Sequence, residues 1–476
     1  MDQQLVTRTD CDIVLKKSVN SDQFEVVNFK LKPFEDKERE YYKADCVLEV
    51  SAKISKNITR YRFFLKKFTT KYAALNELFE EIKTSEREIL FYERLLPLLE
   101  NGLENYQADF VPAFFHAKLN HIMILEDMSL KYFTVAKKSN PHLLDRFHLN
   151  LALNAVAKLH AGSWAYEEKH RNAYAQDLLC QELIWTENNE VIQSGIKGLK
   201  TLLNEYKQTD LNQDIDKLTD RVFEIMKFQT KFRNVLGHGN LHARNMLFKY
   251  DKSNVAKCVL INFGFCKYFL PAYDVLTLIF NCSNKLFRQH YFTYLVKYYY
   301  DILQQELSKE NLSVEQFISF DDFQQTINYL MPAIKLQTIL HLQDFGAKSG
   351  FYKHLQKDET AYRMYLYQDK SFFLLELYKK DPIFKDMINE ALEELIETLT
   401  VPQVSRENCY EILERQVETI YVLDSFKLVP TGDDKDLFEL ILEVSDGQKN
   451  ETVNNYKYLV QCGTDNFFKV QNHVIE

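Results

Sequence analysis

One short stretch of the chain holds the side chains that are best suited to chemistry. It reads LGHGNLHARNMLF from Leu236 to Phe248, and LINFGF follows from Leu260 to Phe265. Its histidine and asparagine side chains can bond backbone groups or offer amide oxygens to a metal ion. Three of the chain's twelve glycines lie here, which indicates tight backbone geometry at a site. A polar turn from Asp251 to Asn254 predicts a hairpin that brings the two motifs together.

These motifs, in this order and spacing, resemble the ecdysteroid kinase-like family of insect small-molecule kinases, relatives of choline kinases and aminoglycoside phosphotransferases. The family's catalytic loop has the form H-G-D-x-x-x-x-N, here His238 to Asn245, and its metal loop has the form I-D-F, here Ile261 to Phe263. The resemblance covers about residues 24 to 400. Further matches are Phe64-Leu65-Lys66, Glu88 to Tyr92, Leu96-Pro97, Leu125 to Met128, Leu159 to Ala161 and Pro271 to Asp274.

The resemblance implies a role for each matching residue. In kinase-type transfer a lysine held by a glutamate grips the phosphates, while carboxylate and amide oxygens hold Mg²⁺. Lys66 and Glu88 match the first pair, and Asn245 matches the amide ligand of the metal. Glu126 and Met128 match the hinge between the lobes, beside the nucleotide.

Two other residues are expected to support the catalytic loop. We expect His238 to bond backbone groups rather than act in catalysis, and Asp274 to bond the backbone of the same loop, as its family counterpart does. His242 follows two residues after the position of the base and could replace it, although a histidine here is more often part of the pocket wall.

Two positions that are aspartate in the family are asparagine here, namely Asn240 and Asn262. An amide cannot accept a proton near neutral pH, so Asn240 gives no general base assistance, which is worth about 10²–10⁴-fold. At Asn262 the metal loses a carboxylate ligand. Between Met226 and Tyr273 the only acidic residue is Asp251 in the turn. ATP and Mg²⁺ are therefore expected to bind weakly or not at all.

A third departure affects the loop that should cover the phosphates. The segment from Glu35 to Glu40 is strongly acidic, and the first hundred residues contain no glycine. Side chains in this loop would crowd the phosphates and their charge would repel them.

The elements around these motifs predict an α+β, two-lobed protein-kinase-like fold. Residues 24 to 68 and the segments VPAFFHAKL and HIMILEDM have strand character, which predicts a small antiparallel-sheet N-lobe over residues 1–128. A helical period runs from Lys71 to Leu99. Mainly helical patterns from about Pro141 predict a larger C-lobe over residues 129–400, which carries the altered catalytic loop.

Residues 401–476 form a C-terminal extension that weakly repeats the strands of the N-lobe. Phe29-Lys-Leu31 and the run VLEVS at 47–51 have counterparts in Phe426-Lys-Leu428 and ILEVS at 441–445. The extension is either a partial second copy of the first sheet or a pair of similar hairpins by chance. Open strand edges in such a sheet would allow self-association.

Composition excludes several partners. The 476 residues carry a net charge of -9 with lysine and arginine scattered among acidic residues, so nucleic acid is not expected. We find no apolar run of about 18 residues and no signal sequence at the N-terminus, so no membrane contact is expected. Eight cysteines without a CxxC pair indicate reduced thiols and a cytoplasmic protein.

The sequence thus predicts a pseudokinase that acts as a ligand-binding or interaction module. Its partner would be a small apolar hydroxylated ligand or another protein. The alternative is an active ATP-dependent kinase for a steroid-like or other small alcohol, because positioning carries much of phosphoryl-transfer catalysis. A third reading is a structural or regulatory module that acts through residues 401–476.

Overall fold

The computed structural model describes residues 5–34, 45–136, 142–171, 177–207, 211–252, 254–347, 349–400, 421–430, 437–446, 452–462 and 468–475. The chain divides into two compact units, Met1–Ala391 and Leu392–Glu476, which are described separately. The acidic segment from Glu35 to Glu40 lies outside the described residues, so its effect on phosphates stays a prediction.

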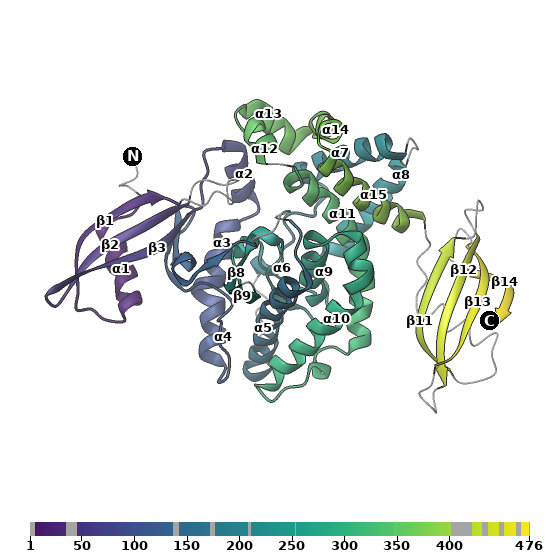
Figure 1. Cartoon of the computed structure of the whole chain (residues 1–476), viewed down its shortest axis with the longest axis horizontal. Helices are drawn as coiled ribbons and strands as arrows, with labels where there is room; N and C mark the ends of the chain where they lie inside the picture. The colour runs from purple at the N-terminus through teal and green to yellow at the C-terminus, as the bar shows by residue number, and fades with distance from the viewer. Residues whose placement is uncertain are drawn as a thin grey trace. The chain divides into compact units, whose positions relative to one another are not determined.

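The first unit begins with the predicted antiparallel sheet, whose five strands lie in the order β1-β2-β3-β5-β4 (Figure 1). In the central strand β3 the buried Phe63 and Leu65 alternate with Lys66, which therefore faces the opposite side of the sheet. The strands are β1 (Glu25–Pro33), β2 (Cys46–Ile54), β3 (Asn57–Lys67), β4 (Phe114–Lys118) and β5 (Ile122–Glu126).

A helix that the sequence patterns did not single out, α1 (Arg8–Val19), covers one face of this sheet (Figure 1). Its Val14 and Leu15 are buried in one cluster with Leu48 and Phe63. Thr7 caps the helix and forms a capping box with Asp10. The apolar face of α1 is short and interrupted by charges, which explains why its period was not apparent.

The helical region between the strands is broken rather than continuous. The single run expected from Lys71 to Leu99 divides into α2 (Ala73–Glu81), α3 (Thr84–Leu90), a π-helical turn (Phe91–Leu95) and α4 (Leu96–Gly102). The break falls at Lys83, whose φ of 54° is left-handed. It separates α3, which carries Glu88, from α2, so the two helices do not continue one another.

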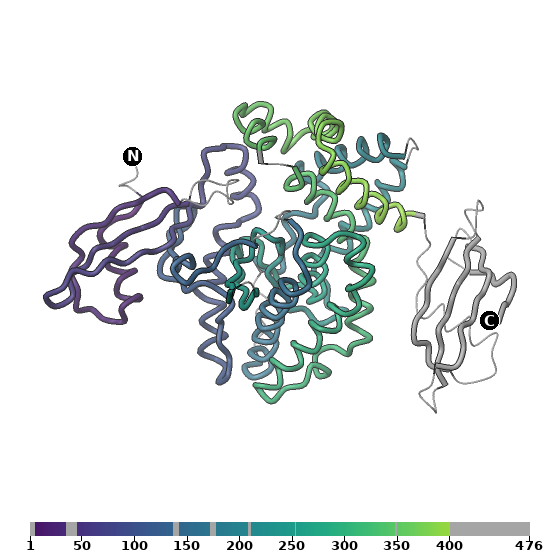
Figure 2. The backbone as a smooth tube through the Cα atoms, in the orientation of Figure 1, coloured from purple at the N-terminus to yellow at the C-terminus, as the bar shows by residue number. Residues whose placement is uncertain are grey.

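The larger lobe is mainly helical, as predicted, and Figure 2 traces its path from blue through teal to green. Every residue of α9 is buried, so this helix forms the centre of the lobe. The helices are α5 (Arg146–His170), α6 (Asp177–Cys180), α7 (Glu190–Lys207), α8 (Asn212–Met226), α9 (Pro271–Cys282), α10 (Lys285–Ser308), α11 (Phe320–Phe345), α12 (Ser349–Leu355), α13 (Glu359–Arg363), α14 (Ser371–Lys380) and α15 (Pro382–Thr400).

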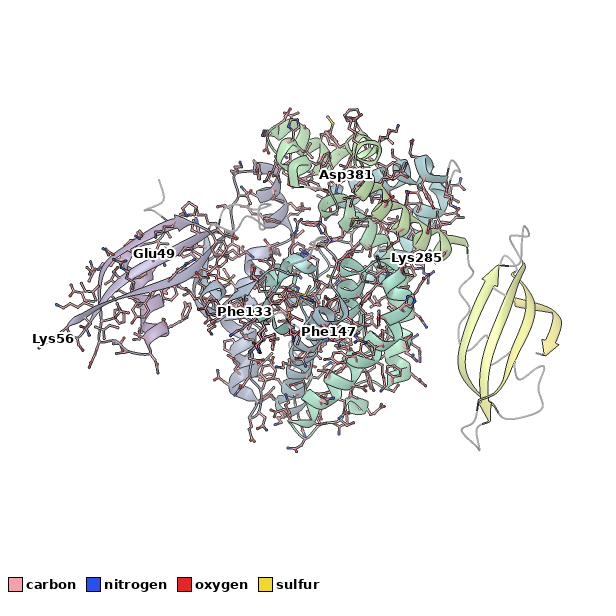
Figure 3. The ribbon with its side chains drawn as sticks, in the orientation of Figure 1. Glu49, Lys56, Phe133, Phe147, Lys285 and Asp381 are labelled. Carbon is pink, nitrogen blue, oxygen red and sulfur yellow. The ribbon has the colours of Figure 1, made fainter. Side chains whose placement is uncertain are left out.

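Short strands position the site motifs against these helices. The predicted hairpin is confirmed: Asp251 pairs with Asn254 at its turn. Phe133 lies where the sheet meets the helical lobe and packs with Met128 and Ile261 (Figure 3). The strands are β6 (Phe133–Thr134), β7 (Val235–Gly237), β8 (Met246–Asp251), β9 (Asn254–Leu260) and β10 (Lys267–Phe269). None of the described helices has the length and apolar character needed to span a membrane.

The second unit contains a four-stranded antiparallel meander of β11 (Tyr421–Pro430), β12 (Leu437–Asp446), β13 (Thr452–Cys462) and β14 (Phe468–Ile475). Its first pair is irregular between Leu423 and Ser425, and the first pair of the N-lobe is irregular at the corresponding residues, Val26 and Asn28. The register of the second strand differs. Phe29 pairs with Val50, which corresponds to Val444 by the sequence match, whereas Phe426 pairs with Leu442, two residues away.

Candidate functional site

A cavity of about 1260 Å³ lies between the sheet and the helical lobe of the first unit. Lys66 and Glu88 lie along it on the sheet side, and Asn240, Asn245 and Asn262 lie along it on the helical side. The fold therefore brings together residues that lie almost two hundred positions apart in the sequence.

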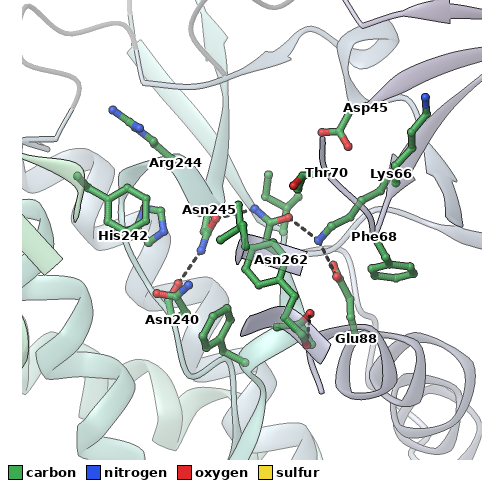
Figure 4. Close-up of a pocket in the computed structure, with 18 of the residues that line it drawn as sticks. Asp45, Lys66, Phe68, Thr70, Glu88, Asn240, His242, Arg244, Asn245 and Asn262 are labelled. Atoms are coloured by element: carbon green, nitrogen blue, oxygen red, sulfur yellow. Dashed lines mark hydrogen bonds and ion pairs between the residues drawn. The ribbon is translucent and has the colours of Figure 1, made fainter. Parts of the chain in front are cut away.

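Lys66 forms the ion pair that its spacing from Glu88 predicts. Its Nζ lies 2.6 Å from Glu88 Oε2 and also donates to Asn262 Oδ1 at 2.9 Å (Figure 4). Glu88 is 1% exposed. Removal of one partner from a buried pair leaves a costly unpaired charge, so the pair holds β3 and α3 together.

Three contacts hold α3 and the π-helical turn after it against the loop that follows Asn262. The rings of Phe91 and Phe263 stack with centroids 3.7 Å apart. The Arg87 guanidinium donates to the Cys266 carbonyl at 3.0 Å. Gly264 lies so close to α3 that an added Cβ would be 3.2 Å from Thr84 Cβ. Glu88 is therefore fixed in place by its neighbours on both sides.

His238 and Asp274 support the catalytic loop from below. The Asn240 N–H donates to His238 Nδ1 at 3.3 Å, so Nε2 carries the proton and donates to the Ile261 carbonyl at 2.9 Å. Burial lowers the pKa of His238, which matches a neutral ring. Asp274 accepts from the N–H groups of His238 and Gly239 at 2.6 and 2.9 Å.

Gly239 is required by the geometry of the same loop. Its φ is +79°, and a Cβ there would lie 2.0 Å from the Phe265 carbonyl oxygen. Only glycine combines this left-handed conformation with so close an approach. The loop of the first motif is thereby held against the second motif.

The two asparagines that replace aspartates take part in a continuous hydrogen-bond chain. Asn262 Nδ2 donates to Asn245 Oδ1 at 2.6 Å, and Asn245 Nδ2 donates to the Asn240 carbonyl at 2.8 Å (Figure 4). Because Asn262 Oδ1 accepts from Lys66, the amide oxygens of Asn262 and Asn245 already accept hydrogen bonds inside the protein.

This arrangement does not fit Mg²⁺, which prefers oxygen ligands with at least one carboxylate. Where the family has a carboxylate, an amide N–H₂ points at the remaining ligand oxygen of Asn245. In the part of the chain that the structure describes, no group of three or more histidine, cysteine or acidic residues could hold a metal ion.

The two predicted hinge residues also line the cavity. The Glu126 N–H donates to the Ala113 carbonyl at 2.8 Å, and its carboxylate pairs with Lys131 at 2.5 Å. Met128 is buried in an apolar cluster with Leu247, which also lines the cavity. The side chain of Glu126 is thus engaged at the protein surface.

A sequence model of the ecdysteroid kinase-like family matches residues 41–312, more than half of the chain. The chain belongs to the ecdysteroid kinase-like family. Comparison with curated proteins gives no match.

Several solved structures are distantly similar to this family member. They include a macrolide 2'-phosphotransferase from Brachybacterium faecium, with 10% identity over 75% of this chain and 98% of that chain, and a TM-score of 0.31. A choline kinase from Streptococcus pneumoniae has 14% identity over 74% and 97%, with a TM-score of 0.30. An AMP-bound spectinomycin phosphotransferase has 14% identity over 74% and 90%, with a TM-score of 0.36.

His242 lines a wall of the cavity of this ecdysteroid kinase-like protein, and the motifs did not predict the two rings that it meets there. His242 is only 7% exposed, and its ring lies 5.1 Å from the ring of His341 and 5.3 Å from that of Phe345. His341 and Phe345 come from α11, and their spacing of four residues places them on one helix face. That spacing is visible in the sequence, but nothing local indicates that the face meets the catalytic loop.

The histidines of this region are expected to make the fold sensitive to acid. Burial lowers the pKa of His142 to about 4 and that of His341 to about 3, and the charge of Arg244 acts in the same direction. Burial also lowers the pKa of His242. The carboxylate nearest to His341 along α11 is that of Asp344. A histidine with a lowered pKa contributes full stability above its ordinary pKa and loses it as the pH falls.

We therefore expect the wild type to lose about 2 kcal/mol more unfolding free energy than His341→Phe between pH 7 and pH 5. Urea unfolding at both pH values measures this difference. The exposed His354 provides the control, because His354→Phe should keep the wild-type pH dependence. An equal loss in wild type and His341→Phe would contradict the expectation.

Proposed function

We propose that the protein is a catalytically impaired member of its family that acts as a ligand-binding or interaction module. The observation that carries this proposal is the double role of Asn262, which accepts from Lys66 and donates to Asn245. In the family this position is an aspartate that holds the metal. Here both polar atoms of the Asn262 amide form hydrogen bonds with other side chains of the protein.

The loss of the base supports the same proposal. Asn240 cannot take the proton of an attacking hydroxyl, and the loop from His238 to Asn245 contains no carboxylate. His242 stands nearby as a neutral imidazole, but its ring packs against the rings of both His341 and Phe345. This packing favours a wall residue over a substitute base.

Nucleotide binding is proposed to be weak and independent of Mg²⁺. The Lys66–Glu88 pair is the part of a nucleotide site that persists, and a lysine can contact phosphates without a metal. The amide chain supplies no carboxylate to hold a cation against those phosphates. ATP would then bind as the free anion.

The apolar half of the cavity supports a second ligand. It is lined by Trp185, Ile192, Leu340 and Leu366, and the volume of the whole cavity, about 1260 Å³, exceeds the 300–1,000 Å³ of typical ligand pockets. We propose a small apolar hydroxylated molecule as its occupant, with a protein partner as the other possibility. A cytoplasmic location is proposed because the eight cysteines are spread along the sequence without a CxxC pair, which indicates reduced thiols.

We expect ATP without Mg²⁺ to raise the melting temperature of the protein, and Mg²⁺ should not increase this rise. Ligand at a hundredfold excess over its dissociation constant adds about 2.7 kcal/mol, which a melting curve registers. Phosphoryl transfer to a panel of small alcohols should stay below about 0.1 s⁻¹, under the 1–100 s⁻¹ of kinases.

Three controls complete this measurement: Mg²⁺ alone, ADP, and a Lys66→Met variant that removes the phosphate contact. A temperature shift that needs ATP and Mg²⁺ together would contradict the proposal, and so would turnover above the limit. If ATP causes no temperature shift under any condition, nucleotide binding is removed from the proposal. The apolar ligand and the protein partner then remain as its binding partners.

The second candidate is an active ATP-dependent phosphotransferase for a steroid-like or other small alcohol. The intact frame favours it, because the Lys66–Glu88 pair and the support of the loop by Asp274 are both present. Asn245 and a shell of water would then hold the metal. The turnover assay separates the two candidates directly.

Self-association through the extension is a further part of the proposal. Among the described strands of the second unit, β11 and β14 each pair on one side only. Such edges can pair with another chain.

A further inference from the structure

One wall of the cavity combines a cation with two imidazoles and an aromatic ring. We call this the imidazole wall and define it as His242, Arg244, His341 and Phe345, which all line the cavity. The rings of His341 and Phe345 lie 4.8 Å apart, and Arg244 Cζ lies 6.0 Å from the centroid of Phe345. Figure 4 shows Arg244 and His242 on the side of the cavity opposite Lys66.

The imidazole wall contains one cationic side chain that lines the cavity. Its imidazoles are neutral at pH 7, so Arg244 is its charged member. On α11, the cavity-lining carboxylate nearest to His341 in sequence is Asp344, whose Oδ1 forms an ion pair with Lys370 Nζ at 2.5 Å. Asn240, in the same loop as Arg244, is neutral where the family has an aspartate.

Two other carboxylates that line the cavity are also held in ion pairs. Glu88 pairs with Lys66, and Asp127 pairs with Arg62 at 2.6 Å. Asparagine in place of the family's two aspartates leaves two fewer negative charges on the side of the cavity that carries Asn240 and Asn262. A guanidinium beside imidazole N–H donors suits the oxygens of a carboxylate, sulfate or phosphate ester.

We propose that the imidazole wall binds the anionic group of an apolar organic anion, such as the sulfate or phosphate ester of a small alcohol, whose hydrocarbon part lies against Trp185 and Leu340. This inference rests on the proposed function, because a site that does not transfer phosphoryl groups can hold an ester without turning it over. A working kinase would instead release such an anion as its product.

Binding of a steroid alcohol and its sulfate ester to the full-length protein tests the inference. Isothermal titration with pregnenolone and pregnenolone sulfate should show the sulfate binding at least about tenfold more tightly. Arg244→Gln should reduce this preference to about twofold or less and leave the affinity for the alcohol unchanged. Arg244→Lys keeps the charge without the planar fork and should give an intermediate preference.

The matched control is Arg94→Gln, because Arg94 is exposed on the helix that follows Glu88 and does not line the cavity. It should keep the full preference. Equal affinities for the two molecules, no binding of the sulfate, or a preference that survives Arg244→Gln would each overturn the inference. Melting curves of every variant check that the protein is folded.

The same samples distinguish this inference from the proposed function. Phosphoryl transfer from ATP to pregnenolone above the limit given earlier would overturn the proposed function whatever the binding data show. Absence of transfer together with equal affinities would overturn the anion site alone. A phosphate ester in place of the sulfate tests whether the wall distinguishes the two groups.

Discussion

The double substitution Asn240→Asp with Asn262→Asp is expected to raise Mg²⁺-dependent phosphoryl transfer from ATP by at least about 100-fold over the wild type. One aspartate restores the proton acceptor and the other restores the carboxylate ligand of the metal. We expect the gain because the rest of the frame is in place: Lys66 is paired with Glu88 at 2.6 Å, and Asp274 holds the loop that carries residue 240.

The geometry of the amide chain explains why both substitutions are needed. In the wild type Asn262 Nδ2 occupies Asn245 Oδ1, and Asn262→Asp removes that donor and frees the oxygen for a cation. Asn262→Asp alone should therefore restore a Mg²⁺-dependent shift of the melting temperature with ATP, but little transfer. Asn240→Asp alone adds a base to a site without metal and should give neither.

Coupled measurement of ADP release with and without Mg²⁺ tests this prediction. The control is Asn28→Asp with Asn328→Asp, which adds the same two charges at exposed positions away from the cavity. Continued inactivity of the Asn240 and Asn262 double variant would contradict it. The defect would then lie in the acidic segment at residues 35–40 or in the ligand half of the cavity.

Local patterns were sufficient to predict the lobes, but the pairing of Lys66 with Glu88 came from the resemblance to the family. Lys66 lies on a strand with period two, and Glu88 lies on a helical run, so each element could be identified from its own sequence. The spacing of the family motifs then related these elements. The break at Lys83 was missed, because a left-handed lysine leaves no compositional signal comparable to glycine.

Contacts made only in three dimensions could not be predicted in this way. The sequence indicates that Asn262 lacks a charge, but not that its amide joins Lys66 to Asn245. Likewise, His341 meets His242 because α11 packs beside the catalytic loop, and these residues are almost one hundred positions apart. Such contacts depend on how the elements pack, which the period of each element does not determine.

Asp274→Ala is expected to lower the free energy of unfolding by about 3–5 kcal/mol. Asp274 is 2% exposed and accepts from the N–H groups of His238 and Gly239, while His160 Nε2 lies 3.2 Å away. Each buried donor left without an acceptor costs about 1–3 kcal/mol. Burial by itself would raise the pKa of Asp274, but the bond to His160 keeps it below its ordinary value, so the acceptor is charged.

Urea unfolding of wild type, Asp274→Ala and Asp274→Asn measures this effect. Asp274→Asn keeps one acceptor oxygen but turns an amide donor toward the other N–H, so its loss should be intermediate. Asp386 is exposed on α15, and Asp386→Ala should change stability by less than about 0.5 kcal/mol. A loss in Asp274→Ala no larger than that of Asp386→Ala would show that the loop N–H groups find other acceptors.

The large effect expected for Asp274→Ala reflects the role of Asp274 as a support of the loop that carries Asn240. Asp274 does not line the cavity, so its carboxylate shapes the catalytic loop without touching a ligand. Residue 240 is asparagine where the family has an aspartate, yet its carbonyl accepts from Asn245, whose amide oxygen accepts from Asn262. Asp274 thus fixes one end of the amide chain that reaches Lys66, and removal of Asp274 should weaken ATP binding along with the fold.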